Sequence, residues 1–342
     1  MRAIMLWSLC AFCLFLTGCL SVTTVQTTVA TTTSMATSQV TTSITTTTAV
    51  TTILTTFSTN EYGFDYLGET PPIGSTAIRF DPPGLVANSV WFYHSVPVFS
   101  PDGTEMYWSK YLVSSDQIEI WYTRKVEGRW STATRLDIEG ITGHLNNPIF
   151  MAGDDGLFFV NIVGGIFAIY RVTRTVSGWG NPIMVDLPIP EGYSLGWDFS
   201  IADNGNMYFP LSSNDLPDVS SIYVSEYHDG VYQIPTMIAN QGTGLYGNFA
   251  PEIAPDESYL FFTSRRDEGY GYHDMYISFR SGDGIFSEPI NMGTQINTAD
   301  EDGRAGISED GIYLFFTTAK AGDRGFNPYW IRIDQLDVFN DR

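Results

Sequence analysis

Residues 249–265 read FAPEIAPDESYLFFTSR, and this stretch sets the pattern for the folded part of the chain. A turn at Pro255 and Asp256 separates one strand-like segment from an aromatic one. Asp suits such turns because its side chain bonds its own backbone. GYHDMYIS at 271–278 and FSEPINMG at 286–293 follow as two further strand-like segments. Together they predict one antiparallel unit of four strands and about 50 residues.

The same turn recurs along the chain, at 100–103, 153–156, 202–205, 254–257 and 308–311. Each turn is followed by an aromatic strand, with aligned residues Trp108, Phe159, Phe209, Phe262 and Phe316. A further strand carries a second aromatic column, Trp121, Tyr170, Tyr223, Tyr276 and Trp330, with steps of 49, 53, 53 and 54 residues. Five such repeats predict an all-β fold, a β-propeller of four-stranded antiparallel blades. Residues 61–94 leave six blades as an alternative.

The last strand of each unit is expected at the outer edge of its blade. Trp130, Tyr232 and Phe286 open this strand, Trp179 holds the corresponding place, and prolines follow at 182, 235 and 289. Proline belongs at a sheet edge because it cannot donate to a ladder. The fifth unit ends after its third strand, at 329–334, and residues 74–80 are the candidate for the missing one. We therefore expect the N-terminal strand to close the ring and remove two free edges.

The fourth repeat resembles the TolB-type, WD-repeat-like propeller repeats of bacterial envelope proteins. The similarity rests on the three segments quoted above and extends over residues 96–334. It implies a propeller in the cell envelope, of a kind often used to bind proteins or glycans. It does not imply a reaction, since propellers host many unrelated functions.

The N-terminus has the features of an export signal. Arg2 precedes an uncharged apolar run at 3–16, which is too short to span a bilayer but suits a signal peptide. The run ends in Leu16-Thr17-Gly18-Cys19, which resembles a bacterial lipobox. Residues 1–18 are thus predicted to be a lipoprotein signal peptide, and Cys19 the lipidated residue that anchors the chain to the cell membrane or outer membrane. An ordinary secretory signal with an incidental Cys19 is the alternative.

Residues 19–60 are predicted to form a threonine-rich disordered tether, and residues 61–342 the propeller. The tether has no charged residue and no periodic apolar pattern. All three cysteines of the chain, at 10, 13 and 19, precede the domain, so the domain contains no disulfide, thiolate metal site or cysteine nucleophile. The net charge of −21 argues against nucleic-acid binding, which needs a basic surface, and against direct adsorption to anionic lipid. Solubility accounts for such a charge, and so does cation binding.

Connections into the innermost strands of a propeller converge on one end of the channel. Here they contain His94, Asn146, Trp197, Asp198, Asn248, Asp302 and Arg304. Acidic, amide, basic and aromatic groups together suit a polar or sugar ligand. The alternative is that these groups satisfy loop backbone and bond one another.

Two further motifs are candidates for a metal site and a nucleophile. The acidic turn containing Asp300 and Asp302 offers hard oxygen ligands for calcium, the one cofactor considered, although an ordinary solvated turn has the same composition. Residues 192–196 match the G-x-S-x-G motif, but no helical pattern follows Ser194, so we expect a loop rather than a nucleophile.

No persuasive catalytic set emerges from these residues. The favoured function is a non-catalytic surface module that binds an envelope protein or a polysaccharide. The alternatives are a glycan-active hydrolase or lyase using channel carboxylates such as Asp198 and Asp302, and a docking part of a larger envelope assembly.

Overall fold

The computed structural model describes residues 64–340 except 83, 84, 86, 88, 89, 177, 243–246 and 321–324. All of these lie in one of the two units of the chain, Thr55–Arg342. The signal peptide at 1–18, Cys19, the tether at 19–60 and the first residues of the predicted domain, 61–63, lie outside the described residues. In the described part of the chain, no helix is long and apolar enough to cross a membrane.

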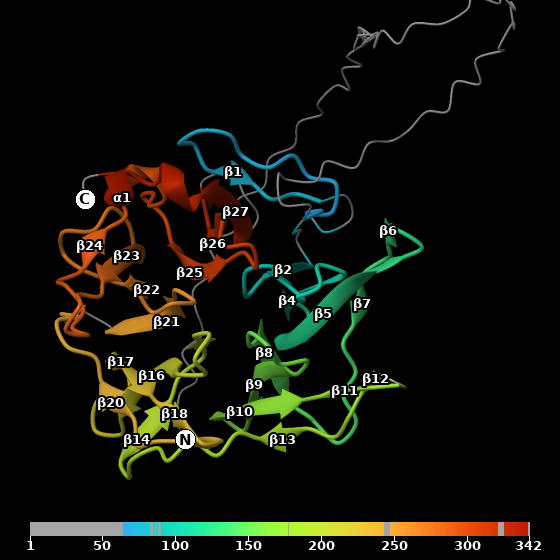
Figure 1. Ribbon diagram of the computed structural model, residues 1–342, viewed down its shortest axis with the longest axis horizontal. Helices are drawn as coiled ribbons and strands as arrows, with labels where there is room; N and C mark the ends of the chain where they lie inside the picture. The colour runs from blue at the N-terminus through green and yellow to red at the C-terminus, as the bar shows by residue number, and fades with distance from the viewer. Residues whose placement is uncertain are drawn as a thin grey trace, which may run out of the picture. The chain divides into compact units, whose positions relative to one another are not determined.

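The described unit is a five-bladed β-propeller, as the repeats predict, with the antiparallel sheets arranged in a ring (Figure 1). Blade 1 contains β2 (Trp91–Tyr93), β3 (Val98–Phe99), β4 (Glu105–Leu112), β5 (Gln117–Val126), β6 (Arg129–Trp130) and β7 (Thr134–Arg135). Blade 2 contains β8 (His144–Phe150), β9 (Leu157–Val163), β10 (Ile166–Val172) and β13 (Ile183–Met184). The hairpin β11 (Arg174–Thr175) and β12 (Gly178–Trp179) follows β10.

Blade 3 contains β14 (Tyr193–Leu195), β15 (Ser200–Ile201), β16 (Met207–Ser213), β17 (Ser220–Ser225) and β20 (Thr236–Met237), with the hairpin β18 (Tyr227–His228) and β19 (Val231–Tyr232). Blade 4 contains β21 (Asn248–Ile253), β22 (Tyr259–Ser264), β23 (Asp274–Phe279) and β24 (Ile290–Asn291). Blade 5 contains β25 (Asp302–Ile307), β26 (Tyr313–Thr318), β27 (Asn327–Arg332) and β1 (Ile78–Arg79). Two 3-10 turns, η1 (Gly293–Gln295) and η2 (Ile333–Gln335), and α1 (Asp337–Asn340) complete the described elements.

All five turns have the same hydrogen bond. In each, an Asp or Asn side chain accepts a hydrogen bond from the backbone N–H two residues later. The pairs are Asp102 with Thr104, Asp154 with Gly156, Asn204 with Asn206, Asp256 with Ser258, and Asp310 with Ile312. A side chain that bonds its own turn fixes the hairpin between the first and second strands. The repeated Asp, replaced by Asn204 in blade 3, is therefore structural in every blade.

The aromatic columns pair across the second and third strands of each blade. Trp108 faces Trp121 in blade 1, and the corresponding residues of blades 2, 3 and 4 pair in the same way. In blade 5 the prediction is wrong by one residue, because Phe316 faces Tyr329 and not Trp330. Trp330 instead faces Phe315 and stacks on it at 5.4 Å between ring centroids.

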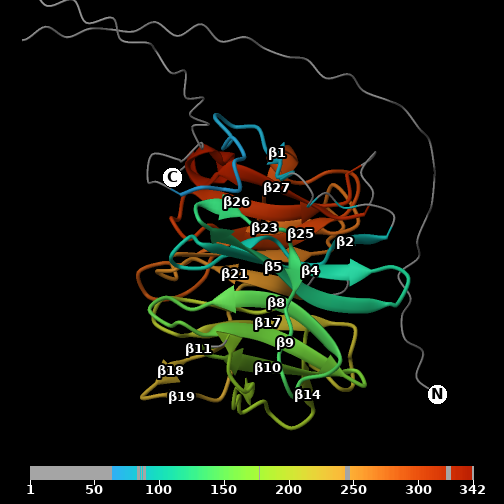
Figure 2. The same cartoon turned by 90° about the vertical axis from the view of Figure 1, so that its right-hand side faces the viewer.

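The predicted ring closure is confirmed. Strand β1 pairs antiparallel with β27, Ile78 opposite Trp330 and Arg79 opposite Tyr329, and the two lie side by side in both views (Figure 2). Phe80 follows β1 and is 1% exposed, with its ring 5.3 Å from the rings of Phe315 and Trp330. Among the described residues before His94, β1 thus completes blade 5 and β2 joins blade 1, and none of them forms a sixth blade.

The outermost strands differ in one respect from the prediction. In blades 2, 3 and 4 the outermost strands are β13, β20 and β24. Each begins directly after the proline at 182, 235 or 289 and is two residues long. The aromatic residues that the sequence predicts at the start of these strands lie instead in short hairpins that follow the third strand of the blade. In blade 3, for example, Tyr232 pairs with Tyr227 in the hairpin of β18 and β19. These aromatics pack between the blades, where buried apolar surface holds neighbouring sheets together.

Candidate functional site

The innermost strands bring five residues to one level of the channel. Val98, Ile149, Ser200, Glu252 and Gly306 each pair with the residue that precedes the aligned aromatic of the second strand. Two residues earlier in each blade lie Val96, Asn147, Asp198, Ala250 and Arg304. The register thus places Asp198 of blade 3 and Arg304 of blade 5 at the same level, on either side of Ala250.

Three of these strands change register at this level. The ladder is interrupted between Asn146 and Ile149, between Phe249 and Glu252, and between Gly303 and Gly306. Asn147, Ala250 and Arg304 there have positive φ angles of 51°, 47° and 52°. A β-bulge re-aims side chains, and L residues in this left-handed region cost of order 1 to 3 kcal/mol each. The surrounding structure therefore holds these backbone conformations in place.

A chain of hydrogen bonds joins the first three blades at the channel mouth. His94 Nδ1 lies 3.1 Å from Asn146 Oδ1, and Asn146 Nδ2 donates to the carbonyl of Trp197 at 3.1 Å. Asn147 Nδ2 donates to the carbonyl of Phe199 at 2.8 Å. Asn146 is fully buried, so its amide is satisfied by the neighbouring blades rather than by water.

The electrostatics of the cluster join it to Arg304. Burial, and then the positive charge of Arg304, lower the pKa of His94 to about 3, so its imidazole is neutral near pH 7. Burial raises the pKa of Asp198, while the Arg304 charge and the Asn146 amide act in the opposite direction. Asp198 is 5% exposed. His94 and Asp198 are therefore each linked to Asn146 and to the charge of Arg304.

Trp197 is the exposed member of this cluster. Its side chain is 45% exposed, and its ring lies 4.9 Å from Phe167 and 5.7 Å from the imidazole of His94. Contacts on two sides fix the ring while leaving part of its surface to solvent. The mouth thus presents an aromatic surface beside buried polar groups.

Asn248 and Asp302 lie elsewhere, although the sequence grouped them with the others. Asn248 Nδ2 donates to the carbonyl of Gly242 at 2.9 Å, and its Oδ1 accepts from Arg266 at 3.1 Å. Asp302 Oδ2 accepts from the Thr298 hydroxyl at 2.9 Å and from the Thr298 backbone. Both residues are fully buried and close their own loops, so they add nothing to the exposed mouth.

The calcium prediction has no geometric support in the described residues. No group of three or more His, Cys, Asp or Glu there has an arrangement that could hold a metal ion. Asp302 is committed to Thr298 as described, and the backbone N–H of Asp300 donates to the Thr298 hydroxyl at 3.1 Å. The site at Asp300 and Asp302 stays a prediction.

Sequence reasoning missed Glu252, which lies on the innermost strand of blade 4. Its Oε1 accepts from the backbone N–H of Ile307 in blade 5 at 2.9 Å. Burial, reinforced by the charge of Glu309, raises its pKa to about 8 in spite of that bond. The sequence does contain a signal for Glu252, because an acidic residue occurs there within a strand predicted to be buried.

The G-x-S-x-G motif has a structural place. Ser194 lies on β14, opposite Ser212, and its hydroxyl donates to Asn214 Oδ1 at 2.8 Å. A nucleophile elbow requires a sharp strand-to-helix turn. Ser194 occupies an edge strand instead, so the predicted loop is wrong, and the backbone at Ser194 does not have the form of such an elbow.

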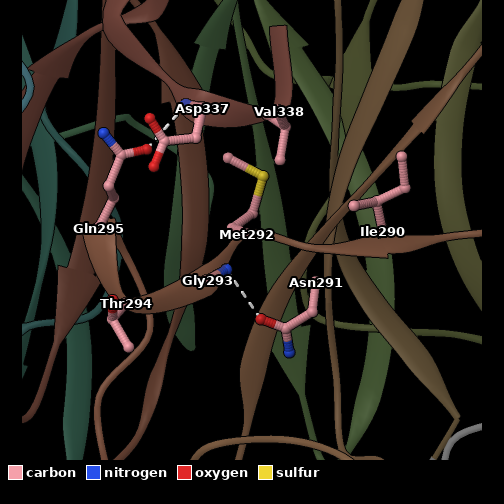
Figure 3. Close-up of a pocket in the computed structure, with 8 residues that line it drawn as sticks. All are labelled: Ile290, Asn291, Met292, Gly293, Thr294, Gln295, Asp337 and Val338. Carbon is pink, nitrogen blue, oxygen red and sulfur yellow. Dashed lines mark hydrogen bonds between the residues drawn. The ribbon is translucent and has the colours of Figure 1, made fainter. Parts of the chain in front are cut away.

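A cavity of about 370 Å³ lies away from the channel mouth (Figure 3). It is formed where blade 4 meets the C-terminal residues, and Asn291, Met292, Gln295 and Asp337 line it. Asp337 donates its backbone N–H to Gln295 at 2.8 Å, and Asp337 is its one charged lining residue. This lining offers little chemistry for recognition compared with the mouth.

Comparison with known proteins shows no family for this chain. No family model matches the chain, and no curated protein matches it. An endo-arabinase from Bacteroides thetaiotaomicron is similar in structure, with TM-score 0.47 and 14% identity over 78% of this chain and 98% of that one. A protein of unknown function from Dyadobacter fermentans has TM-score 0.48 and 12% identity over 78% and 84%. The NanB sialidase from Streptococcus pneumoniae has TM-score 0.41 and 11% identity over 65%, and the chain spans 37% of it.

Likeness at this level assigns no activity to the chain. The TolB-type resemblance also stays a prediction, since no family model supports it.

Proposed function

We propose that the protein is an exported, lipid-anchored propeller that binds a polysaccharide of the cell envelope at its channel mouth, without cleaving it. The observation that carries this proposal is the half-exposed, fixed ring of Trp197 beside His94, Asn146 and Asp198. The anchor and the location rest on Cys19 and the lipobox-like residues before it.

The mouth has the two kinds of group that sugar recognition needs. The Trp197 ring offers an apolar face for the C–H groups of a pyranose, and neighbouring polar groups offer bonds to hydroxyls. A neutral imidazole has one donor and one acceptor nitrogen, which suits a hydroxyl group. The lowered pKa of His94 keeps it in that form near pH 7.

A polysaccharide fits the mouth better than a protein partner does. A protein interface is expected to have an apolar core with aromatic anchors. Exposed apolar side chains are found instead on the outermost strands, as at Ile183, Met184 and Met237. Binding of a protein there would leave the mouth free.

Cleavage of a glycan is the second candidate, and Asp198 is the observation that favours it. A buried carboxyl with a raised pKa is suited to be a general acid. Glycoside hydrolysis needs a second carboxylate placed roughly 5 to 9 Å away. Asp302, the partner predicted from the sequence, is fully buried, and its Oδ2 accepts from the backbone and hydroxyl of Thr298. Binding without cleavage therefore fits the described residues better.

A glycan array probed with the mature full-length chain in detergent tests the proposal, followed by a reducing-sugar assay on each glycan bound. We expect binding with no release of reducing ends. Turnover would overturn the non-catalytic assignment and make Asp198→Asn the first variant to assay. Absence of binding to every glycan would overturn the proposal, and pull-down from envelope extracts would then test the outermost strands as a protein surface.

A further inference from the structure

We infer that the polysaccharide is acidic, and that Arg304 pairs with its carboxylate at the channel mouth. This inference rests on the proposed function, because it names the ligand class of the same site.

Arg304 is a cation that forms no ion pair with any described residue. Among the described residues, no Asp or Glu forms an ion pair with it, and its Nε is buried with no hydrogen-bond partner. The central carbon of its guanidinium lies 5.4 Å from the centroid of the Phe326 ring. This cation–π contact does not occupy the N–H donors of the guanidinium. A buried donor without an acceptor costs of order 1 to 3 kcal/mol, and more when it is charged. A ligand that supplied an acceptor would recover that cost.

The backbone holds Arg304 in this position. Its N–H donates to the Thr263 hydroxyl of blade 4 at 3.2 Å, and its φ of 52° is a conformation that few non-glycine residues adopt. Strain of this kind persists where the surrounding structure determines it, and often at binding sites. The bulge between Gly303 and Gly306 therefore determines the backbone conformation from which the Arg304 side chain projects.

Along the ring, a small residue separates Arg304 of blade 5 from Asp198 of blade 3. The residue between them at the same level is Ala250 of blade 4, whose side chain is one methyl group. The charge of Arg304 nevertheless reaches both Asp198 and His94, where it affects their pKa values. The side chains of Asp198 and His94 are therefore both within electrostatic reach of Arg304, and the Trp197 ring lies 5.7 Å from the imidazole of His94.

A carboxylate suits this arrangement better than a hydroxyl group. A guanidinium has a planar fork of donors that matches a carboxylate with two parallel hydrogen bonds. Asp198 supplies no ion pair to Arg304, and its raised pKa lets it become the hydrogen-bond donor when an anion is bound beside it. Sulfate and phosphate esters share the negative charge but not the planar geometry, so they form a separate arm of the test.

The test compares acidic oligosaccharides with neutral ones of the same length. The probes are galacturonate, glucuronate and mannuronate oligomers, their methyl esters, the parent neutral oligomers and sulfated oligomers, titrated into the mature full-length chain by calorimetry. We expect acids to bind at least tenfold more tightly than their esters. Arg304→Gln should abolish this difference, and Arg304→Lys should keep part of it, because Lys retains the charge without the fork. Arg332→Gln is the matched control, since Arg332 pairs with Asp334.

The outcomes distinguish failure of the acidic-ligand inference from failure of the proposed function. Equal binding of acids and esters, or an acid preference that survives Arg304→Gln, would overturn the inference and leave glycan binding standing. A preference for sulfated oligomers would overturn the carboxylate assignment. Failure of every oligomer to bind, with no glycan retained on the array, would overturn the proposed function and this inference with it. Thermal melting of each variant separates lost binding from lost folding.

Discussion

Asp198, two residues before β15 of blade 3, and Arg304, on β25 of blade 5, occupy the same level of the channel and do not form an ion pair within the described part of the chain. Opposite charges that can pair in a buried site normally do so, because an unpaired charge is costly. The residue of blade 4 at this level is Ala250, which is too small to pair with either group. The separation of the two charges by a small residue is therefore the feature of this propeller that most needs a ligand to explain it.

Replacement of Trp197 tests the aromatic part of the mouth. Trp197→Ala should weaken binding of any glycan found on the array at least tenfold, which is about 1.4 kcal/mol. The same variant should cost little stability, since the ring is 45% exposed. Calorimetric titration measures the affinity. Tyr193→Ala is the control, because Tyr193 is also partly exposed but its ring packs on Tyr223 of the third strand. Equal affinity in both variants would exclude Trp197 as a contact.

Asn146 should link stability to binding. Asn146→Ala removes the bonds to His94 and to the Trp197 carbonyl and leaves their partners unpaired. We expect a loss of about 1 to 3 kcal/mol in the free energy of unfolding, together with weaker glycan binding. Urea denaturation and titration measure the two effects. Asn214→Ala changes an exposed amide and should affect neither. A variant of Asn146 as stable as the wild type would show that the hydrogen-bond chain is not needed.

Ring closure should account for a large share of stability. Phe80→Ala removes a ring that is 1% exposed and packed on Phe315 and Trp330, so it should cost about 3 to 5 kcal/mol. Ile73→Ala, at a side chain 93% exposed, should cost less than about 0.5 kcal/mol. Urea denaturation compares the two variants. If Phe80→Ala unfolded at the wild-type urea concentration, the N-terminal strand would not be what closes the ring.

Glu252 should make stability depend on pH. Its pKa is raised from 4.5 in the unfolded chain to about 8 in the native state. The native state therefore holds this proton more tightly, and the resulting stability is full below about pH 4.5 and is lost as pH rises through about 8. Glu252→Gln should flatten the fall in unfolding free energy between pH 5 and pH 8, by a few kcal/mol at most, since one pKa unit corresponds to about 1.4 kcal/mol.

The control for this pH series is Glu288→Gln, at an exposed position before β24. It should retain the wild-type slope. A Glu252→Gln profile parallel to the wild type would show that the carboxyl is not held protonated in the native state.

The blade pattern could be predicted from sequence because its signals are local. A turn Asp bonds a backbone N–H two residues away, and an aromatic column repeats once per blade. The error at Trp330 has a local cause as well, since Tyr329 and Trp330 are adjacent aromatics and only the ladder decides which one faces Phe316.

The site was harder to predict because bulges shift the register. Asn248 and Asp302 come two residues before Ala250 and Arg304, and their loops supply Gly242 and Thr298 as hydrogen-bond partners. No local pattern reveals such partners. The proximity of Asp198 and Arg304 likewise depends on the ring, which brings together residues more than 100 positions apart.

The most direct test of ligand binding at the channel mouth is a crystal structure of the chain with the oligosaccharide that binds most tightly. We predict a sugar ring stacked on Trp197, with its carboxylate on Arg304 and beside Asp198. A ligand bound instead in the cavity lined by Asn291, Gln295 and Asp337, or along the outermost strands, would contradict the account.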